Sequence, residues 1–233
     1  VLKINNRRLN LEFYCHTLGM KNLLEEGAIV SLGDQTNSEK LVLEESPSMR
    51  SRKVEGPKKL AQITLKVVNP QEIEALLARS EEVYELYRGE KGYAFKAISP
   101  EGDIFLVHAE DDPQTLLKLC EVPSFQAQDD FVGLSQFDVE EILLHVPNKV
   151  VAQSYYQRFG ASLPIGFQEE EGQDLLVENT ATWDLSMIKF SLENFDADSL
   201  SSLFEDRVLF VPKSKKFLIA TDDSQIDLWF EKV

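Results

Sequence analysis

The fold is decided by two neighbouring stretches, LAQITLKVVNP at residues 60–70 and YAFKAISPEGDIFLVH at residues 93–108. In the first, polar and apolar residues alternate as in a half-buried strand, and Pro70 stands where a helix can begin. In the second, two apolar runs flank SPEGD at residues 99–103, whose proline and glycine are typical of a hairpin turn. Together they predict a strand, a helix and a hairpin, in this order.

This order of elements recurs along the chain. An apolar run at residues 1–4 is followed by a helix with Tyr14 on its apolar face and by short strands. The order begins again after residue 134, and Asn148 to Tyr156 span eight positions, as Asn6 to Tyr14 do. Equal spacing of this kind indicates an internal duplication. The further strands that we expect are residues 22–25, 28–32, 41–44, 83–87, 141–146, 175–178, 187–192, 208–211, 217–220 and 226–230.

The third repeat is expected to be shortened. Asn6 and Asn69 are 63 positions apart, whereas Asn148 and Asn194 are only 46 apart, so a strand and a long loop are missing. We therefore predict an α+β fold of βαβββ units in two domains, residues 1–110 and a reduced domain at residues 135–233. Residues 111–134 form the linker, with a short helix at 116–119. Neighbouring units in each half should share a concave sheet with helices outside.

Charge narrows the function classes. The chain has 233 residues, with 24 Lys and Arg against 40 Asp and Glu and a formal net charge of −16. The first 110 residues hold 15 basic and 17 acidic residues, so the remainder holds 9 and 23. This acidity repels nucleic acid and anionic membranes. We expect no nucleic acid partner and no membrane span, because no apolar run reaches the required ~20 residues.

Cysteine content and the first residues bear on location. Cys15 and Cys120 are too few for a disulfide framework, which favours a reducing compartment. The start of the chain is typical of a strand rather than of a secretory leader, and without an initiator Met it leaves upstream residues open. We expect a cytoplasmic protein.

Several local motifs carry a family resemblance. The Asn-rich turn before the first helix, Phe13-Tyr14, Leu18-Gly19 and the 99–103 turn make the chain similar to the glyoxalase/dioxygenase (vicinal oxygen chelate) superfamily. More narrowly, LVLEESPSMR at residues 41–50 resembles the bacterial CppA family, as does VEGPKKL at residues 54–60. CppA proteins are described as proposed complement-degrading proteinases. The resemblance implies tandem glyoxalase-like units, and a surface or released location stays open with it.

The superfamily resemblance also implies where a metal would bind. Its enzymes place His or Gln on the first strand of a unit and Glu on the last. Gln62 matches such a first-strand position, and Leu106 stands at a Glu position. In the first unit the first-strand position falls before Val1, and Glu44 or Val42 matches the last strand. We expect no metal in the first domain.

In the second domain the matched positions are Glu141, Glu178, Met187 and Asp227. Carboxylates suit a hard cation such as Ca²⁺, but a methionine and the lack of histidine make a poor site. Glu141 and Asp227 are therefore minor metal candidates, and the favoured interpretation is solvated acids of an acidic domain. We expect no cofactor.

The proteinase description calls for cleavage chemistry, which the sequence does not supply. His16, His108 and His145 are the only histidines, and no two stand on one helical face with a Glu between them, as zinc proteinases require. No serine elbow is present. Cys15 and Cys120 are interpreted as structural, and the catalytic residues are unknown.

One loop reverses the overall charge. Residues 45–59 carry five basic and two acidic residues, and we interpret Arg50 and Arg52 as an anion-binding pair, with Gln62 and Glu44 in the same ligand site. A solvated connecting loop is the alternative.

If this loop binds a ligand, the partner is a small anionic ligand or a protein. The leading function is a binding or interaction protein without a complete metal site. The alternatives are a proteinase acting on the third complement component, or a weakly metal-dependent enzyme.

Overall fold

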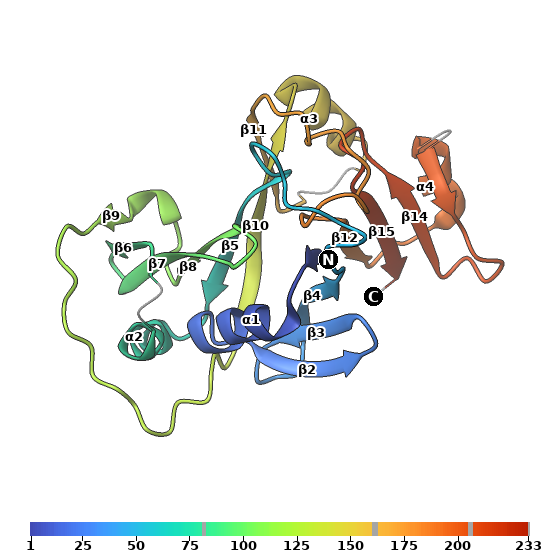
Figure 1. The fold of residues 1–233 in the computed structure, drawn as a ribbon. Helices are drawn as coiled ribbons and strands as arrows, with labels where there is room; N and C mark the ends of the chain where they lie inside the picture. Colours follow the sequence, from blue (N-terminus) through green and yellow to red (C-terminus); the bar gives the residue numbers. More distant parts are fainter. Residues whose placement is uncertain (81–82, 160–162, 205–206, 233) are drawn as a thin grey trace.

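A computed structural model of the chain describes residues 1–80, 83–159, 163–204 and 207–232. Helices pack on mixed sheets, which confirms the predicted α+β class (Figure 1). The strands form a first sheet in the order β1-β4-β3-β2, a central sheet in the order β11-β10-β5-β8-β7-β6-β9, and a third sheet in the order β12-β15-β14-β13. Among the described residues, no helix is long and apolar enough to cross a membrane.

The first two units follow the predicted order. Asn6 caps the first helix by accepting from the backbone N–H of Leu9, and Gly19, with φ +71°, follows the helical segment in the left-handed conformation expected of a C-cap residue. Asn69 caps the second helix through Gln71. The elements are β1 (Leu2–Ile4), α1 (Arg7–Leu11), the π-helix η1 (Glu12–Thr17), β2 (Lys21–Glu26), β3 (Ile29–Gly33), β4 (Glu39–Glu45), β5 (Leu60–Val67), α2 (Pro70–Arg79), β6 (Glu85–Arg88), β7 (Tyr93–Ile98) and β8 (Ile104–His108).

The connecting segment differs from the prediction. Residues 116–119 are not helical. A short 3₁₀ turn, η2 (Pro113–Thr115), precedes β9 (Leu117–Lys118), which pairs with the edge strand β6. The segment predicted as a helix instead covers that edge. The pairing leaves fewer backbone N–H and C=O groups of β6 without partners.

The second half is reduced, as expected, but by more than one strand. The strand predicted at residues 175–178 is wrong, because turn bonds from Leu175 N–H to Gly172 and from Val177 N–H to Asp174 curl this segment. The elements here are β10 (Phe137–Val146), α3 (Lys149–Gln157), β11 (Ile165–Glu169), β12 (Met187–Leu192), α4 (Ala197–Phe204), β13 (Val208–Phe210), β14 (Phe217–Thr221) and β15 (Asp227–Lys232).

The units pair differently from the expectation. We expected neighbouring units in each half to share a sheet, but β5 of the second unit pairs antiparallel with β10 of the third, so one sheet runs through both halves (Figure 1). The first and fourth units meet through β1: the Lys3 N–H bonds to the Asp184 carbonyl at 3.0 Å, and Leu2 bridges Leu185. The edge of β5 is thus covered by β10, and the edge of β1 by residues 184–185. Segments far apart in sequence therefore lie side by side.

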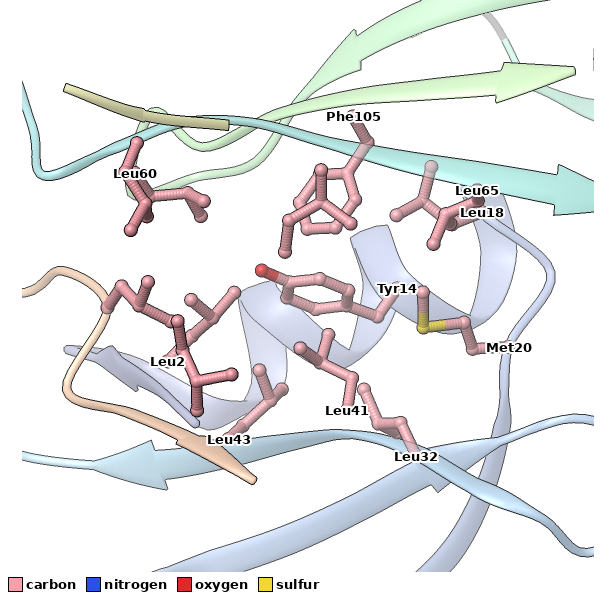
Figure 2. Packing of buried hydrophobic residues seen from close by; sticks show 14 of the residues in the cluster. Leu2, Tyr14, Leu18, Met20, Leu32, Leu41, Leu43, Leu60, Leu65 and Phe105 are labelled. Carbon is pink, nitrogen blue, oxygen red and sulfur yellow. The ribbon is translucent and has the colours of Figure 1, made fainter. Parts of the chain in front are cut away.

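The aromatic pair on the first helix is core packing, as interpreted from its spacing. Tyr14 lies between the first sheet, which contributes Leu41 and Leu43, and the central sheet, which contributes Leu60 and Phe105 (Figure 2). Its ring meets Phe105 edge-to-face at 5.5 Å. The helical segment is thus clamped between two sheets, and the opposite face of each sheet is left for other side chains.

Candidate functional site

The face of the first sheet opposite the helix carries a partly buried ion pair between Lys3 and Glu44. Leu2, Ile4 and Leu43 face the helix, so Lys3 and Glu44, which alternate with them, lie on the other face. The parallel pairing of β1 and β4 places Lys3 directly beside Glu44. Lys3 Nζ lies 2.7 Å from Glu44 Oε1, and the Lys3 side chain is only 7% exposed. The sequence match placed the first-strand position before Val1 and missed this lysine, although a charge inside an apolar run was visible.

Asp227 lies on the fourth unit near the same pair. The parallel pairing of β12 and β15 places Met187 beside Asp227. Burial raises the pKa of Asp227, and the Asn179 hydrogen bond and the ammonium groups of Lys59 and Lys3 oppose that rise. Two ammonium groups thus exert their positive charge on this carboxyl group.

The central sheet offers little to a cation. Gln62 donates from Nε2 to Thr64 Oγ1 at 3.1 Å, and Thr64 pairs in register with the buried Leu106. Glu141 lies on β10 against Gly166, at a polar cavity of about 410 Å³, in a different sheet from Asp227. The two minor metal candidates are thus not neighbours in any sheet.

The residues present do not fit the metal that the fold family implies. An ammonium group donates hydrogen bonds and cannot coordinate a cation, and Lys3 already neutralises Glu44. Leucine and methionine stand at two further matched positions, Leu106 and Met187. Within residues 1–80, 83–159, 163–204 and 207–232, no three His, Cys, Asp or Glu side chains gather closely enough to hold a metal ion.

The basic loop is largely paired within the chain. Arg52 forms two hydrogen bonds of 2.7 Å with Asp174, whose side chain is 3% exposed, and this pairing lowers the pKa of Asp174. Lys58 lies 2.5 Å from Asp103. Lys59 is buried and donates to the Val177 carbonyl at 2.6 Å. Arg50, by contrast, is exposed.

Two of the three histidines bond to backbone carbonyl groups, and the third lies beside a glutamate. His16 and His145 bond to the carbonyl groups of Arg79 and Lys58, at 3.0 and 2.8 Å. His108 is buried 2.8 Å from Glu140, and burial lowers its pKa.

Cys15 does not offer an activated thiol. Burial raises the pKa of the Cys15 thiol, which disfavours the thiolate needed for attack. Cys120 is exposed.

A cavity that the sequence did not reveal lies beside α3. It has a volume of about 390 Å³ and is bordered by α3 and by the turn between β14 and β15. Asp222 at its edge is 4% exposed, and burial raises the pKa of this carboxyl group to about 6. Asp222 accepts hydrogen bonds from Tyr156 Oη at 2.9 Å and from the Ile226 N–H at 2.8 Å. The only sequence signal was the Asp222-Asp223 pair between two apolar runs.

Comparison with protein families covers nearly the whole chain. The family model described as CppA N-terminal matches residues 1–119, and the model described as CppA C-terminal matches residues 134–230. No curated protein matches the chain.

Solved structures agree with this assignment. The crystal structure of the cppA protein from Streptococcus pneumoniae TIGR4 is 50% identical, has a TM-score of 0.92, and is matched over 100% of this chain and 95% of that one. Glyoxalase I from Zea mays is 11% identical with a TM-score of 0.53, over 99% and 90% of the two chains. A candidate dioxygenase from Bacillus subtilis is 12% identical with a TM-score of 0.60, over 99% and 83%. The last two show the fold alone.

Proposed function

Because this chain belongs to the CppA family, we propose a function for it from its fold and its site residues. We propose that it is a binding protein, which kept a glyoxalase-like scaffold but has no complete metal site. The observation that carries the proposal is the 2.7 Å pair between Lys3 and Glu44. A lysine ammonium beside the carboxylate at a matched position supplies the positive charge that a bound cation would otherwise supply there.

The charges around this pair support the same conclusion. A bare cation near Glu44 would have to displace or repel the Lys3 ammonium, whose side chain is buried and therefore weakly screened by solvent. Asp227 shares its surroundings with Lys3 and Lys59, so it too has positive charge close by. The hydrolase alternative is disfavoured by His16 and His145, which are both engaged by backbone carbonyl groups.

Fewer residues are now available for the predicted anion-binding site. Arg52 is bound to Asp174, Gln62 to Thr64 and Glu44 to Lys3. Arg50 remains exposed on the loop. We therefore propose Arg50, with the exposed Lys53 beside it, as the part of this loop that could meet an anionic ligand or an acidic protein surface.

Calorimetric titration of the full chain with Mn²⁺, Ni²⁺ and Zn²⁺ tests the proposed function. We expect no saturable binding tighter than about 100 μM, a free energy of roughly −5.5 kcal/mol. Lys3→Glu replaces the ammonium with a third carboxylate and is expected to gain Mn²⁺ affinity. One ion per wild-type chain, bound below about 10 μM and lost in Glu44→Gln, would overturn the proposal.

A further inference from the structure

The cavity beside α3 has the form of a small-molecule site. Its volume of about 390 Å³ falls in the range of roughly 300–1,000 Å³ that ligand pockets occupy. Its lining includes four aliphatic side chains, those of Val146, Val151, Ala152 and Leu176, and two acidic ones, those of Asp222 and Asp223.

The walls of this cavity are fixed by hydrogen bonds and aromatic packing. Tyr155 Oη donates to the Thr221 carbonyl at 2.9 Å, and Tyr156 Oη donates to Asp222 at 2.9 Å. Both tyrosine rings meet Phe159 edge-to-face, at 5.5 and 5.9 Å. These contacts tie α3 to the β14–β15 turn, so the cavity is formed before any ligand arrives, which lowers the ordering cost of binding.

The carboxylates in the lining select the sign of the ligand. Asp222 accepts hydrogen bonds from Tyr156 Oη and from the backbone N–H groups of Ile226 and Ser224, and its two oxygens have about four lone-pair sites, which leaves room for another donor. Asp223 is paired with Arg207 at 2.6 Å and is about half exposed, and the Lys59 ammonium also acts on Asp222. Residues 111–233, to which most of the lining belongs, carry 9 basic and 23 acidic side chains, and this net negative charge attracts cations.

We propose that this cavity binds an organic amine, with its ammonium group beside Asp222 and Asp223 and its hydrocarbon body along Val151 and Leu176. The inference deepens the proposed function, on which it rests, by naming a ligand class and a site.

Titration of the full chain with 2-phenylethylamine, followed by NMR or calorimetry, tests the proposal. 2-Phenylethanol serves as the neutral analogue of the same size, and 3-phenylpropionate as the anionic one. We expect saturable binding of the amine at least about tenfold tighter than binding of either analogue. Equal affinities for amine and alcohol, or no saturable amine binding, would overturn the proposal.

Variants locate the site. Val150 and Val151 are adjacent and exposed on α3, but only Val151 lines the cavity. Val151→Trp should therefore reduce amine affinity at least about tenfold while Val150→Trp leaves it unchanged. Asp222→Asn should reduce the amine affinity by a similar factor. Because Asp222 is buried, this variant could fail to fold, and the comparison of Val151→Trp with Val150→Trp then decides the result. An unchanged affinity in Val151→Trp overturns the site. Tight metal binding by the wild-type chain would overturn the proposed function. The amine titration would still show whether this cavity binds an amine, so the two outcomes can be told apart.

Discussion

At the scale of single residues, the account depends on Lys3. A lysine flanked by Leu2 and Ile4 in a buried strand needs a partner for its charge, and the parallel register with β4 supplies Glu44. The sequence showed the charge but not the register, because β1 has only three residues and its partner lies some forty positions away. The pairing of Lys3 with Glu44 could therefore not be foreseen.

Removing one member of this pair should destabilise the fold. We expect Lys3→Met to lower the free energy of unfolding by about 1–2 kcal/mol, since it leaves a partly buried carboxylate without its cation. The Lys3→Met/Glu44→Gln double variant should lose less than the sum of the single variants. Urea denaturation measures all three, with the exposed Lys53→Met as the control. A Lys3→Met effect no larger than that of the control would contradict this.

Asp222 should make stability depend on pH. Its pKa is raised by burial from an ordinary value of 3.8 to about 6, so the folded chain holds the proton that the unfolded chain releases. The stabilising contribution of the protonated form is present below about pH 4 and is lost as pH rises through 6. Relative to wild type, Asp222→Asn should therefore gain up to about 3 kcal/mol between pH 4 and pH 7. Urea denaturation across this range measures it, and a constant difference would refute the linkage.

At the scale of elements, most helices and strands were predictable because local signals agreed. Asn caps, Pro70 and the 99–103 turn gave boundaries that the structure confirms. The failures occurred where distant contacts overrode local pattern. The segment at 175–178 has an apolar run like that of a strand, but Asp174 is drawn to Arg52 and the chain turns.

The Arg52–Asp174 contact should hold the long basic loop in place. Arg52→Ala would leave the buried Asp174 carboxylate without its cation, so we expect the free energy of unfolding to fall. Amide exchange should accelerate at Glu55, whose N–H bonds to Asp174 at 2.7 Å, and at Trp183, whose N–H bonds to the Arg52 carbonyl at 2.9 Å. Arg50→Ala, on the same loop, is the matched control and should change neither quantity. Similar effects in both variants would show that the Arg52–Asp174 contact does not hold the loop in place.

At the scale of the whole molecule, the number and kind of units could be predicted, but not which units pair. Each unit exposes an open strand edge, and the sequence alone gives no preference for a neighbouring partner over a distant one. The structure joins β5 to β10 in register from Val67 and Phe137 to Leu60 and Leu144. Candidate site residues were assigned by position within units, so the actual neighbours of Glu44, Asp227 and Glu141 could not be foreseen.

The shared central sheet predicts that the two halves unfold together. Trp183 and Trp229 are the only tryptophans and both lie in the C-terminal half, so fluorescence reports that half while circular dichroism reports the whole chain. We expect coincident urea transitions. Leu65→Ala, in the buried centre of β5, should cost about 2–4 kcal/mol and shift both curves equally. A fluorescence midpoint unchanged in this variant would mean that the halves are independent.

We have proposed that the Lys3 ammonium stands where a metal ion would otherwise balance Glu44. Anomalous X-ray diffraction from crystals of the full chain grown with Mn²⁺ or Zn²⁺ is the decisive measurement. We expect Lys3 Nζ within ion-pair distance of Glu44 and no anomalous peak between Glu44 and Asp227. A fully occupied peak there, with the Lys3 side chain displaced, would contradict it.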